Sequence, residues 1–325
     1  MAEGITVPEV DVASIPELGE RIVANMERAI VGKTEVVRLV LTAVLAGGHI
    51  LIEDVPGVGK TVLAKSLARS IGASFKRIQF TPDLLPGDVT GMEIYNQLTA
   101  GFEYRPGPIM AQIVLADEVN RATPKTQSAL LESMEEGQVT VGGVSHWVPR
   151  PFVVLATQNP VEYEGTFPLP EAQLDRFAAR LSLGYPDPRA EAEVLARGGM
   201  AHPVETLEAV CDASDILAAQ EVTRAIYVDP AVRQYIIALA NETRRHPDVY
   251  LGASPRGSLA IQGLAQARAA LEGRDFVLPD DVKAVAPPAL GHRLILRRGA
   301  GSGRTPADEL VQGILSRLPV PGTSG

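Results

Sequence analysis

The sequence predicts an α/β domain built on a parallel sheet, followed by a smaller domain made only of helices. Short apolar runs alternate with helical patterns through the first half, which is typical of a parallel sheet covered on both faces. One of these runs leads into a glycine-rich loop and then a helix. Beyond Pro186 the strand patterns fade while helical patterns continue. We therefore expect an α/β domain over residues 1–186, a linker over 187–204 and a helical domain over 205–325.

Four apolar runs are predicted to form the sheet. The run over residues 113–116 shows no polar alternation, which is typical of a parallel strand buried on both faces. Two hairpins are expected as inserts, near residues 91–106 and 138–149. In the second, Gly142-Gly143 joins two short runs, a strong signal for a two-residue turn. The predicted strands of the sheet cover residues 49–52, 75–80, 113–116 and 152–157.

The helices are predicted from apolar residues that recur at helical spacing. Ser14 and Pro16 indicate the start of the first helix, and Gly47-Gly48 the end of the second. Thr123-Pro124 indicates the start of the helix after the third strand. The predicted helices cover residues 14–29, 35–46, 60–68, 124–134, 191–197, 214–223, 230–244, 256–271, 279–285 and 305–318.

The glycine-rich loop lies between the first strand and a helix that opens with Lys60-Thr61. Its glycines allow successive backbone N–H groups to converge on phosphate oxygens, and the helix N-terminus adds partial positive charge. Lys60 is expected to reach the β- and γ-phosphates, and the Thr61 hydroxyl to bind Mg²⁺. The sequence therefore predicts a site for ATP or ADP with Mg²⁺. The residues expected to contact the nucleotide here are Pro56, Gly57, Val58, Gly59, Lys60, Thr61 and Val62.

One position departs from the usual form of such loops. The pattern ordinarily begins with a glycine five residues before Gly59, where this chain has Asp54. Aspartate tolerates left-handed backbone better than most residues, so we expect the loop to keep its shape.

Polar residues also follow the third and fourth strands, at the end of a parallel sheet where ligands bind. Asp117 is expected to orient Mg²⁺ through water, opposite Thr61. Glu118 fits the general base that polarises the water attacking the γ-phosphate. An acidic pair that only caps a helix is the alternative. Asn159 follows the next strand, where its amide would hold that water, although Asn-Pro alone indicates only a turn.

Composition and charge restrict the class of function. A net charge of −9 argues against a general affinity for the phosphates of nucleic acids. Cys211 is the only cysteine, so no intrachain disulfide is possible and a reducing compartment is expected. We find no apolar run long enough to span a bilayer and no apolar signal core at the N-terminus, which favours a cytoplasmic protein. The histidines are scattered, so Mg²⁺ is the only metal expected.

Longer stretches of the chain resemble one family. Between about residues 28 and 290 the chain resembles the AAA+ ATPases, and within them the MoxR family, which is similar to the magnesium-chelatase ATPase subunits. The resemblance implies a P-loop AAA+ core followed by an all-α lid. It rests on the strings IVGKTEVV, DVPGVGKT, FKRIQFTPDLLPGDVTG, FEYRPGPI, LADEVNRATPKTQSALLESMEEGQVTV, ATQNP and EGTFPLPEAQLDRF.

This resemblance assigns residues outside the loop and the carboxylate pair. Val31 and Gly32 look like the segment that packs on adenine, although a turn between two helices fits equally well. Arg176, in the segment LDRF, resembles an arginine finger that a subunit offers to its neighbour's γ-phosphate. The alternative is an ion pair with Glu171 or Asp175 on its own helix.

Two further arginines are candidates. Arg256, in the segment SPRG, is similar to the sensor-2 residue, which would touch the γ-phosphate from the lid and couple nucleotide state to domain angle. A solvated arginine at a helix start is the alternative, although the helix dipole disfavours a cation there. Arg121 lies close to Glu118 in sequence and is a candidate for action across a subunit interface.

The resemblance also implies an assembly and a role. MoxR-like proteins are expected to form a ring, expected here to be a hexamer, and to hydrolyse ATP at subunit interfaces, with both hairpins on the pore side. The implied role is chaperone-like maturation or activation of a client enzyme complex, for example by metal-cofactor insertion. The implied partner is a separate protein with a von Willebrand factor type A domain. Two alternatives stay open, namely a magnesium-chelatase-like motor subunit and a slow nucleotide-gated scaffold.

Overall fold

A five-stranded parallel sheet forms the centre of the molecule. The computed structural model describes residues 11–159, 165–196, 203–297 and 306–321. The strand order is β2-β5-β8-β1-β9, and each neighbouring pair is parallel. Because every strand runs in the same direction, the loops that follow their carboxyl ends meet at one edge. The strands are β1 (His49–Glu53), β2 (Phe75–Gln79), β5 (Ile113–Asp117), β8 (Val153–Gln158) and β9 (Phe177–Leu181).

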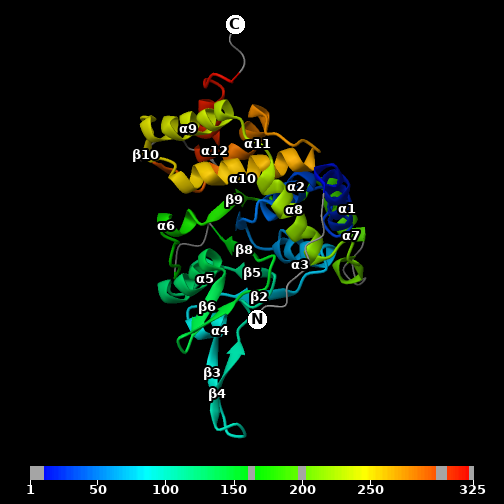
Figure 1. Ribbon diagram of the computed structural model, residues 1–325, viewed down its shortest axis with the longest axis vertical. Helices are drawn as coiled ribbons and strands as arrows, with labels where there is room; N and C mark the ends of the chain where they lie inside the picture. Colours follow the sequence, from blue (N-terminus) through cyan, green and yellow to red (C-terminus); the bar gives the residue numbers. More distant parts are fainter. Residues whose placement is uncertain (1–10, 160–164, 197–202, 298–305, 322–325) are drawn as a thin grey trace.

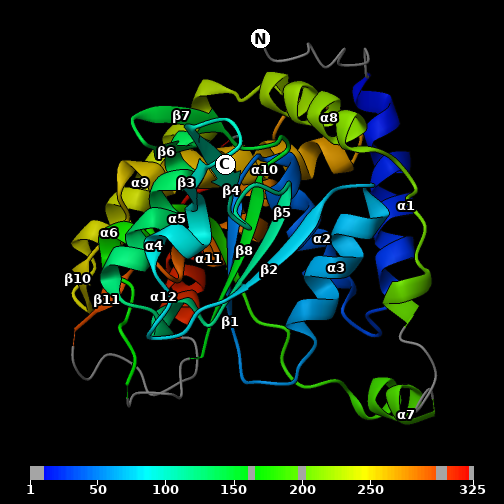
Figure 2. The same cartoon turned by 90° about the horizontal axis from the view of Figure 1, so that it is seen from below.

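Helices cover both faces of this sheet (Figure 2). On one face α1 to α3 pack on side chains such as Ile50 and Leu115, and on the other α4 and α5 pack on Leu51 and Val114. Successive strand residues therefore serve opposite apolar clusters, as the pleat requires. These helices are α1 (Ile15–Glu27), α2 (Thr34–Leu45), α3 (Lys60–Ser70), α4 (Pro86–Thr90) and α5 (Pro124–Glu136).

The second half of the chain is helical and packs against the edge strand β9 and the N-terminal helices. Figure 1 shows α9 to α12 together at one end of the molecule. Their apolar residues join those of α1 to α3 in a single buried cluster. The division of the chain near residue 186 stays a prediction. The elements are α6 (Glu171–Leu174), α7 (Pro188–Ala196), α8 (Ala213–Ala225), α9 (Pro230–Arg245), β10 (Val249–Leu251), α10 (Pro255–Leu271), α11 (Pro279–Leu290), β11 (Ile295–Leu296) and α12 (Pro306–Leu315).

Both predicted hairpins are present. β3 (Gly91–Asn96) pairs antiparallel with β4 (Gly101–Pro106), and this hairpin projects from the end of the molecule opposite α9 to α12 (Figure 1). β6 (Gln138–Val141) pairs with β7 (Val144–Trp147), with Gly142 and Gly143 at positive φ in the turn. The two glycines adopt the left-handed backbone that a tight hairpin turn requires.

The predicted fold class is confirmed, although several elements differ from the prediction. No predicted element corresponds to β9, to the short helix α4, or to the paired strands β10 and β11 of the domain expected to be all-helical. α11 continues to Leu290 through two prolines, whereas the prediction stops at residue 285. Residues 197 and 305, at the ends of two predicted helices, lie outside the described residues, as does part of the predicted linker. No helix in the described ranges is long and apolar enough to cross a membrane.

Candidate active site

The glycine-rich loop connects the carboxyl end of β1 to the first turn of α3. Gly57 and Gly59 have φ values of +85° and +99°, in the left-handed region that glycine adopts without strain. A Cβ atom added to either glycine would meet no atom within 4 Å. The loop therefore leaves open space beside these two glycines. Open space and a helix N-terminus are features that a phosphate site requires.

Lys60 and Thr61 form the first turn of α3, as the sequence predicts for the phosphate site. The Lys60 ammonium donates to the backbone carbonyl of Asp54, at 2.9 Å, so it already lies across the loop. Both side chains are half-buried. The cation and the positive end of the α3 dipole thus reinforce each other at the loop.

Asp54 keeps the loop in shape by a different means from the one expected. Among the described non-glycine residues only Ala100 and Glu118 have positive φ, so Asp54 does not use the left-handed region. Its buried carboxylate instead accepts from three groups: the Val55 N–H (2.9 Å), the Ser182 hydroxyl (2.9 Å) and the Gly184 N–H (2.7 Å). The side chain thereby ties the phosphate loop to the segment after β9.

Asp117 ends β5 and is buried at the same edge of the sheet. One carboxylate oxygen accepts from the Thr157 hydroxyl at 2.6 Å, and the other from the Arg77 guanidinium at 2.6 Å. Burial of a carboxylate is costly unless it is paired in this way. The Thr157 and Arg77 contacts therefore hold the Asp117 carboxylate in place at this edge of the sheet.

Glu118 follows at once and has φ 58°, an uncommon conformation for a residue with a side chain. Its N–H donates to the Thr157 hydroxyl at 2.9 Å, which holds this conformation. The carboxylate accepts from the Gln79 amide at 2.7 Å and lies 3.2 Å from the Arg121 Nε. Glu118 thus faces β2 and Arg121 in this conformation of the protein.

Asn159 follows β8 and is buried at the same edge. The Asp54 N–H donates to the carbonyl of the preceding residue, Gln158, at 3.3 Å, so the end of β8 adjoins the phosphate loop. The structure therefore brings the loop, Asp117, Glu118 and Asn159 to one edge of the sheet. No cluster of three or more Cys, His, Asp or Glu side chains suited to a metal occurs in the described ranges, at this edge or elsewhere.

The predicted adenine segment lies between α1 and α2. Gly32 has φ +71°, and a Cβ atom there would lie 3.4 Å from Ala190. The neighbouring Lys33 ammonium donates to the Tyr185 carbonyl at 2.9 Å. Gly32 and Lys33 thus lie against the segment that follows β9, which begins beside Asp54.

Arg176 and Arg256 lie elsewhere. Both guanidiniums pair with Glu135, in the last turn of α5, with 2.9 Å between Arg176 and the carboxylate. Arg176 therefore pairs neither with Glu171 nor with Asp175. Arg176, Arg256 and Glu135 line one pocket together with His49, which is the first residue of β1. The phosphate loop, in contrast, begins after the last residue of β1. Five residues of strand span about 16 Å, further than an arginine side chain reaches.

The structure adds residues to which sequence reasoning assigned no role. Arg77 and Gln79 lie two residues apart on β2 and contact Asp117 and Glu118, respectively. The Thr157 hydroxyl contacts both acidic residues. Glu135 joins the two distant arginines. Polar residues at the carboxyl end of β2 are the signal that points to Gln79, but the pairing of β2 with β5 is needed to use it.

Comparison with known proteins identifies the family to which this fold belongs. The model of the ATPase family associated with various cellular activities (AAA) matches residues 49–179, and that of the AAA lid domain matches residues 241–314. A crystal structure described as a candidate ATPase from Cytophaga hutchinsonii superimposes with a TM-score of 0.88, is 38% identical and covers 95% of this chain and 96% of its own. Fold, phosphate loop and matches define an AAA+ ATPase, an ATP-hydrolysing P-loop enzyme.

Two relatives narrow the class. Chaperone MoxR1 of Mycobacterium tuberculosis is 41% identical over 311 residues, which is 93% of this chain and 82% of that protein. The uncharacterized protein YeaC of Bacillus subtilis is 54% identical over 306 residues, covering 94% of this chain and 95% of YeaC. The chain belongs to the MoxR family of AAA+ ATPases.

Proposed function

We propose that this protein assembles into a homo-oligomeric ring, a hexamer, and that each ATP is hydrolysed between two subunits. The observation that carries the proposal is the position of Arg176 and Arg256. Both lie by Glu135, at the amino end of β1, whereas the phosphate loop of the same chain follows its carboxyl end. An arginine that stabilises phosphoryl transfer must reach the γ-phosphate. These two can do so only on the nucleotide of a neighbouring subunit.

Within one subunit, the edge of the sheet supplies the remaining groups. The loop N–H groups and Lys60 hold the phosphates, and Glu118 accepts the proton of the attacking water while Asn159 orients it. The Gln79 and Arg121 contacts of Glu118 must open before its carboxylate can take that proton.

The cation site is proposed at the same edge. Thr61 and Asp117 offer a hydroxyl and a carboxylate, the hard oxygen ligands that Mg²⁺ prefers. Bound there with the nucleotide, Mg²⁺ would neutralise charge on the phosphate oxygens. Val31 and Gly32 are proposed to pack on the adenine.

The cellular role is proposed from the family. The relative named a chaperone is 41% identical over most of the chain, which supports a chaperone-like role in the cytoplasm. We propose that this role is the maturation or activation of a client enzyme complex, for example by metal-cofactor insertion. The proposed partner is a protein with a von Willebrand factor type A domain. The hairpin of β3 and β4 exposes Leu98 and Phe102, which offers an apolar surface for contact with a client.

Mixed rings test the shared site. Arg176→Ala should bind ATP normally and hydrolyse it more slowly by a factor on the order of 10³. Lys60→Ala should lose ATP binding. When the two are mixed in equal amounts, about a quarter of the interfaces of a ring combine an intact loop with an intact Arg176. Phosphate release should therefore rise above that of both parents.

The matched control mixes Arg176→Ala with the double variant Lys60→Ala/Arg176→Ala, in which no interface is complete. Light scattering confirms ring formation in every sample, and subunits with different tags confirm mixing. If mixed rings form and release no more phosphate than the control, the arginine acts within its own chain and the shared site is wrong.

A further inference from the structure

We propose that Glu135 is a positioning residue that holds Arg176 and Arg256 as a pair, so that both are offered together to the neighbour's nucleotide. The inference rests on the proposed function, in which these arginines act across the interface. It adds a residue that touches neither nucleotide and acts through the arginines.

The contacts of Glu135 divide one carboxylate between two cations. One oxygen lies 2.9 Å from the Arg176 Nη2, and the other accepts from the Arg256 Nη2. Two guanidiniums brought this close repel each other, and a shared carboxylate offsets that repulsion. All three side chains stay partly exposed, at 34% for Glu135, 27% for Arg176 and 48% for Arg256. The pair is therefore accessible to a neighbouring molecule.

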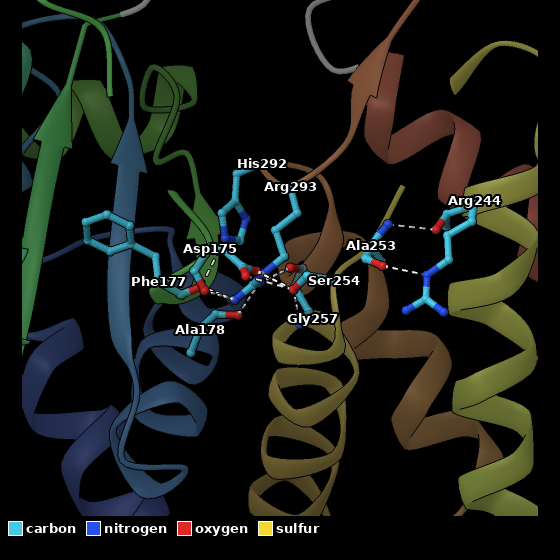
Figure 3. A network of polar contacts seen from close by, with 11 residues as sticks. Asp175, Phe177, Ala178, Arg244, Ala253, Ser254, Gly257, His292 and Arg293 are labelled. Carbon is cyan, nitrogen blue, oxygen red and sulfur yellow. Dashed lines mark hydrogen bonds and ion pairs between the residues drawn. The ribbon is translucent and has the colours of Figure 1, made fainter. Parts of the chain in front are cut away.

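A second network joins the backbones that carry the two arginines (Figure 3). Asp175 precedes Arg176, and Ser254, the N-cap of α10, lies two residues before Arg256. The Ser254 hydroxyl is 2.7 Å from the Asp175 carboxylate, and the Arg293 Nε donates to the same carboxylate at 2.8 Å. Arg293 also donates to the carbonyls of Asp175 and Phe177, at 3.0 and 2.6 Å. This network therefore holds together the two segments that carry Arg176 and Arg256.

The sheet fixes Glu135 itself through His49. The Val154 N–H donates to the His49 Nδ1 at 3.0 Å, so the Nε2 carries the proton and donates to the Met134 carbonyl at 3.0 Å. Met134 immediately precedes Glu135. The N-terminus of α5, at Pro124, lies six residues after Glu118. One helix therefore connects the general base of one site to the arginines offered to the next.

This role differs from that of an ordinary surface ion pair. Partly exposed pairs contribute about 0–1 kcal/mol to stability, so loss of Glu135 should leave folding nearly unchanged. Misplacing a reacting group by about 1 Å can lower the rate on the order of 10²-fold. The expected effect is therefore on turnover, with the thermal midpoint and the ATP affinity of the subunit unchanged, because its own phosphate loop is at the other end of β1.

The experiment compares Glu135→Gln and Glu135→Ala with Glu136→Gln, a control at the exposed next position of α5. We expect phosphate release to fall about 10²-fold in Glu135→Ala and by less in Glu135→Gln, which keeps one acceptor oxygen. Glu136→Gln should match the wild type. Adding Glu135→Gln to the double variant Arg176→Ala/Arg256→Ala should cost little further activity, because the carboxylate acts through these two arginines.

Mixed rings decide where Glu135 acts. Glu135→Gln mixed with Lys60→Ala should regain activity, since the Lys60→Ala subunit supplies an intact carboxylate and arginine pair. The reference is the mixture of Arg176→Ala with Lys60→Ala. If the reference recovers and the Glu135→Gln mixture does not, or if Glu135→Gln is as fast as the wild type or faster, the positioning role is overturned. If the reference itself fails to recover in confirmed mixed rings, the proposed function is wrong instead.

Discussion

Glu118 illustrates how single residues at this edge are held for chemistry. A left-handed backbone at a residue with a side chain costs about 1–2 kcal/mol, and here the Thr157 hydroxyl holds it. The same hydroxyl donates to Asp117, so both acidic residues depend on one buried threonine. Strain that is held by a polar contact at the end of a parallel strand is typical of a functional site.

Glu118→Gln should retain ATP binding and lose turnover. The amide has nearly the same shape but cannot accept the proton of the attacking water, and loss of such assistance costs on the order of 10²–10⁴ in rate. Calorimetry would measure ATP affinity, and phosphate release the turnover. A variant that hydrolyses ATP at the wild-type rate would show that another group is the base.

Asp54→Ala should destabilise the phosphate loop. The substitution leaves the part-buried N–H groups of Val55 and Gly184 without their acceptor, and a fully buried unsatisfied donor costs about 1–3 kcal/mol, an upper bound for each. We expect a lower free energy of unfolding in urea and weaker ATP binding. Asp54→Asn, which keeps one acceptor oxygen, should lose less. Equal stability of the alanine variant and the wild type would contradict the anchoring role of this carboxylate.

The candidate residues at this edge could be named from the sequence because each has a local signal. Asp117, Glu118 and Asn159 come at the ends of strands, Lys60 follows the glycine-rich loop after another strand, and parallel strands end together. Glu135 could not be named in this way. It lies on the exposed side of a helix, and its partners belong to segments 41 and 121 residues away, which only the packed structure brings to it.

At the scale of elements, the sequence predicts β1, β2, β5 and β8 and misses β9, which lies at one edge of the sheet. Its residues alternate between buried and half-buried positions, with two alanines and Arg180 among five residues. Such a strand contains no β-branched residue and two alanines, so its β-propensity is weak. Pairing with β1 and cover from α10 and α11 stabilise it instead. Tertiary contacts of this kind leave no local pattern.

The two hairpins are joined by an aromatic contact that the sequence does not reveal. The rings of Tyr104 on β4 and His146 on β7 stack with centroids 3.9 Å apart. Stacked aromatic pairs contribute about 0.5–1.5 kcal/mol. The pair therefore couples the projecting hairpin to the one that continues from α5, the helix that starts beside Glu118.

His146→Ala should loosen the hairpins without unfolding the protein. Loss of the stack should speed amide hydrogen exchange in residues 91–106 and 138–149 by about 2- to 10-fold. Mass spectrometry of exchanged peptides would measure this. Trp147→Ala is the matched control, because Trp147 is exposed on the same strand and outside the stack. Similar exchange in the two variants would mean that the stack does not couple the hairpins.

At the scale of the whole molecule, two buried histidines connect distant parts of the chain. His49 links β1, β8 and α5, and His292 donates to the Phe177 carbonyl of β9 at 3.0 Å from the segment after α11. Burial lowers the pKa of His49 to about 4 and the pKa of His292 well below its usual value. Both are therefore neutral in the folded protein at physiological pH.

This makes stability depend on pH in a defined direction. In the unfolded chain His49 takes up a proton near pH 6.5, whereas in the folded protein it does so only near pH 4. Protonation therefore favours unfolding between these values, and stability is full above pH 6.5 and falls as the pH decreases. The slope is about 1.4 kcal/mol per pH unit, so His49 accounts for a loss of about 2 kcal/mol between pH 7.5 and pH 5.0.

His49→Gln should remove this dependence. A glutamine amide can still accept from Val154 and donate to the Met134 carbonyl, but it does not titrate. The variant can be less stable at pH 7.5, yet between pH 7.5 and pH 5.0 it should lose about 2 kcal/mol less than the wild type. Urea unfolding at the two pH values measures both losses, and groups common to the two proteins, His292 included, cancel in the difference. If both proteins lose the same free energy of unfolding, His49 is not held neutral by burial. Contacts other than the His49–Met134 hydrogen bond would then have to hold the last turn of α5.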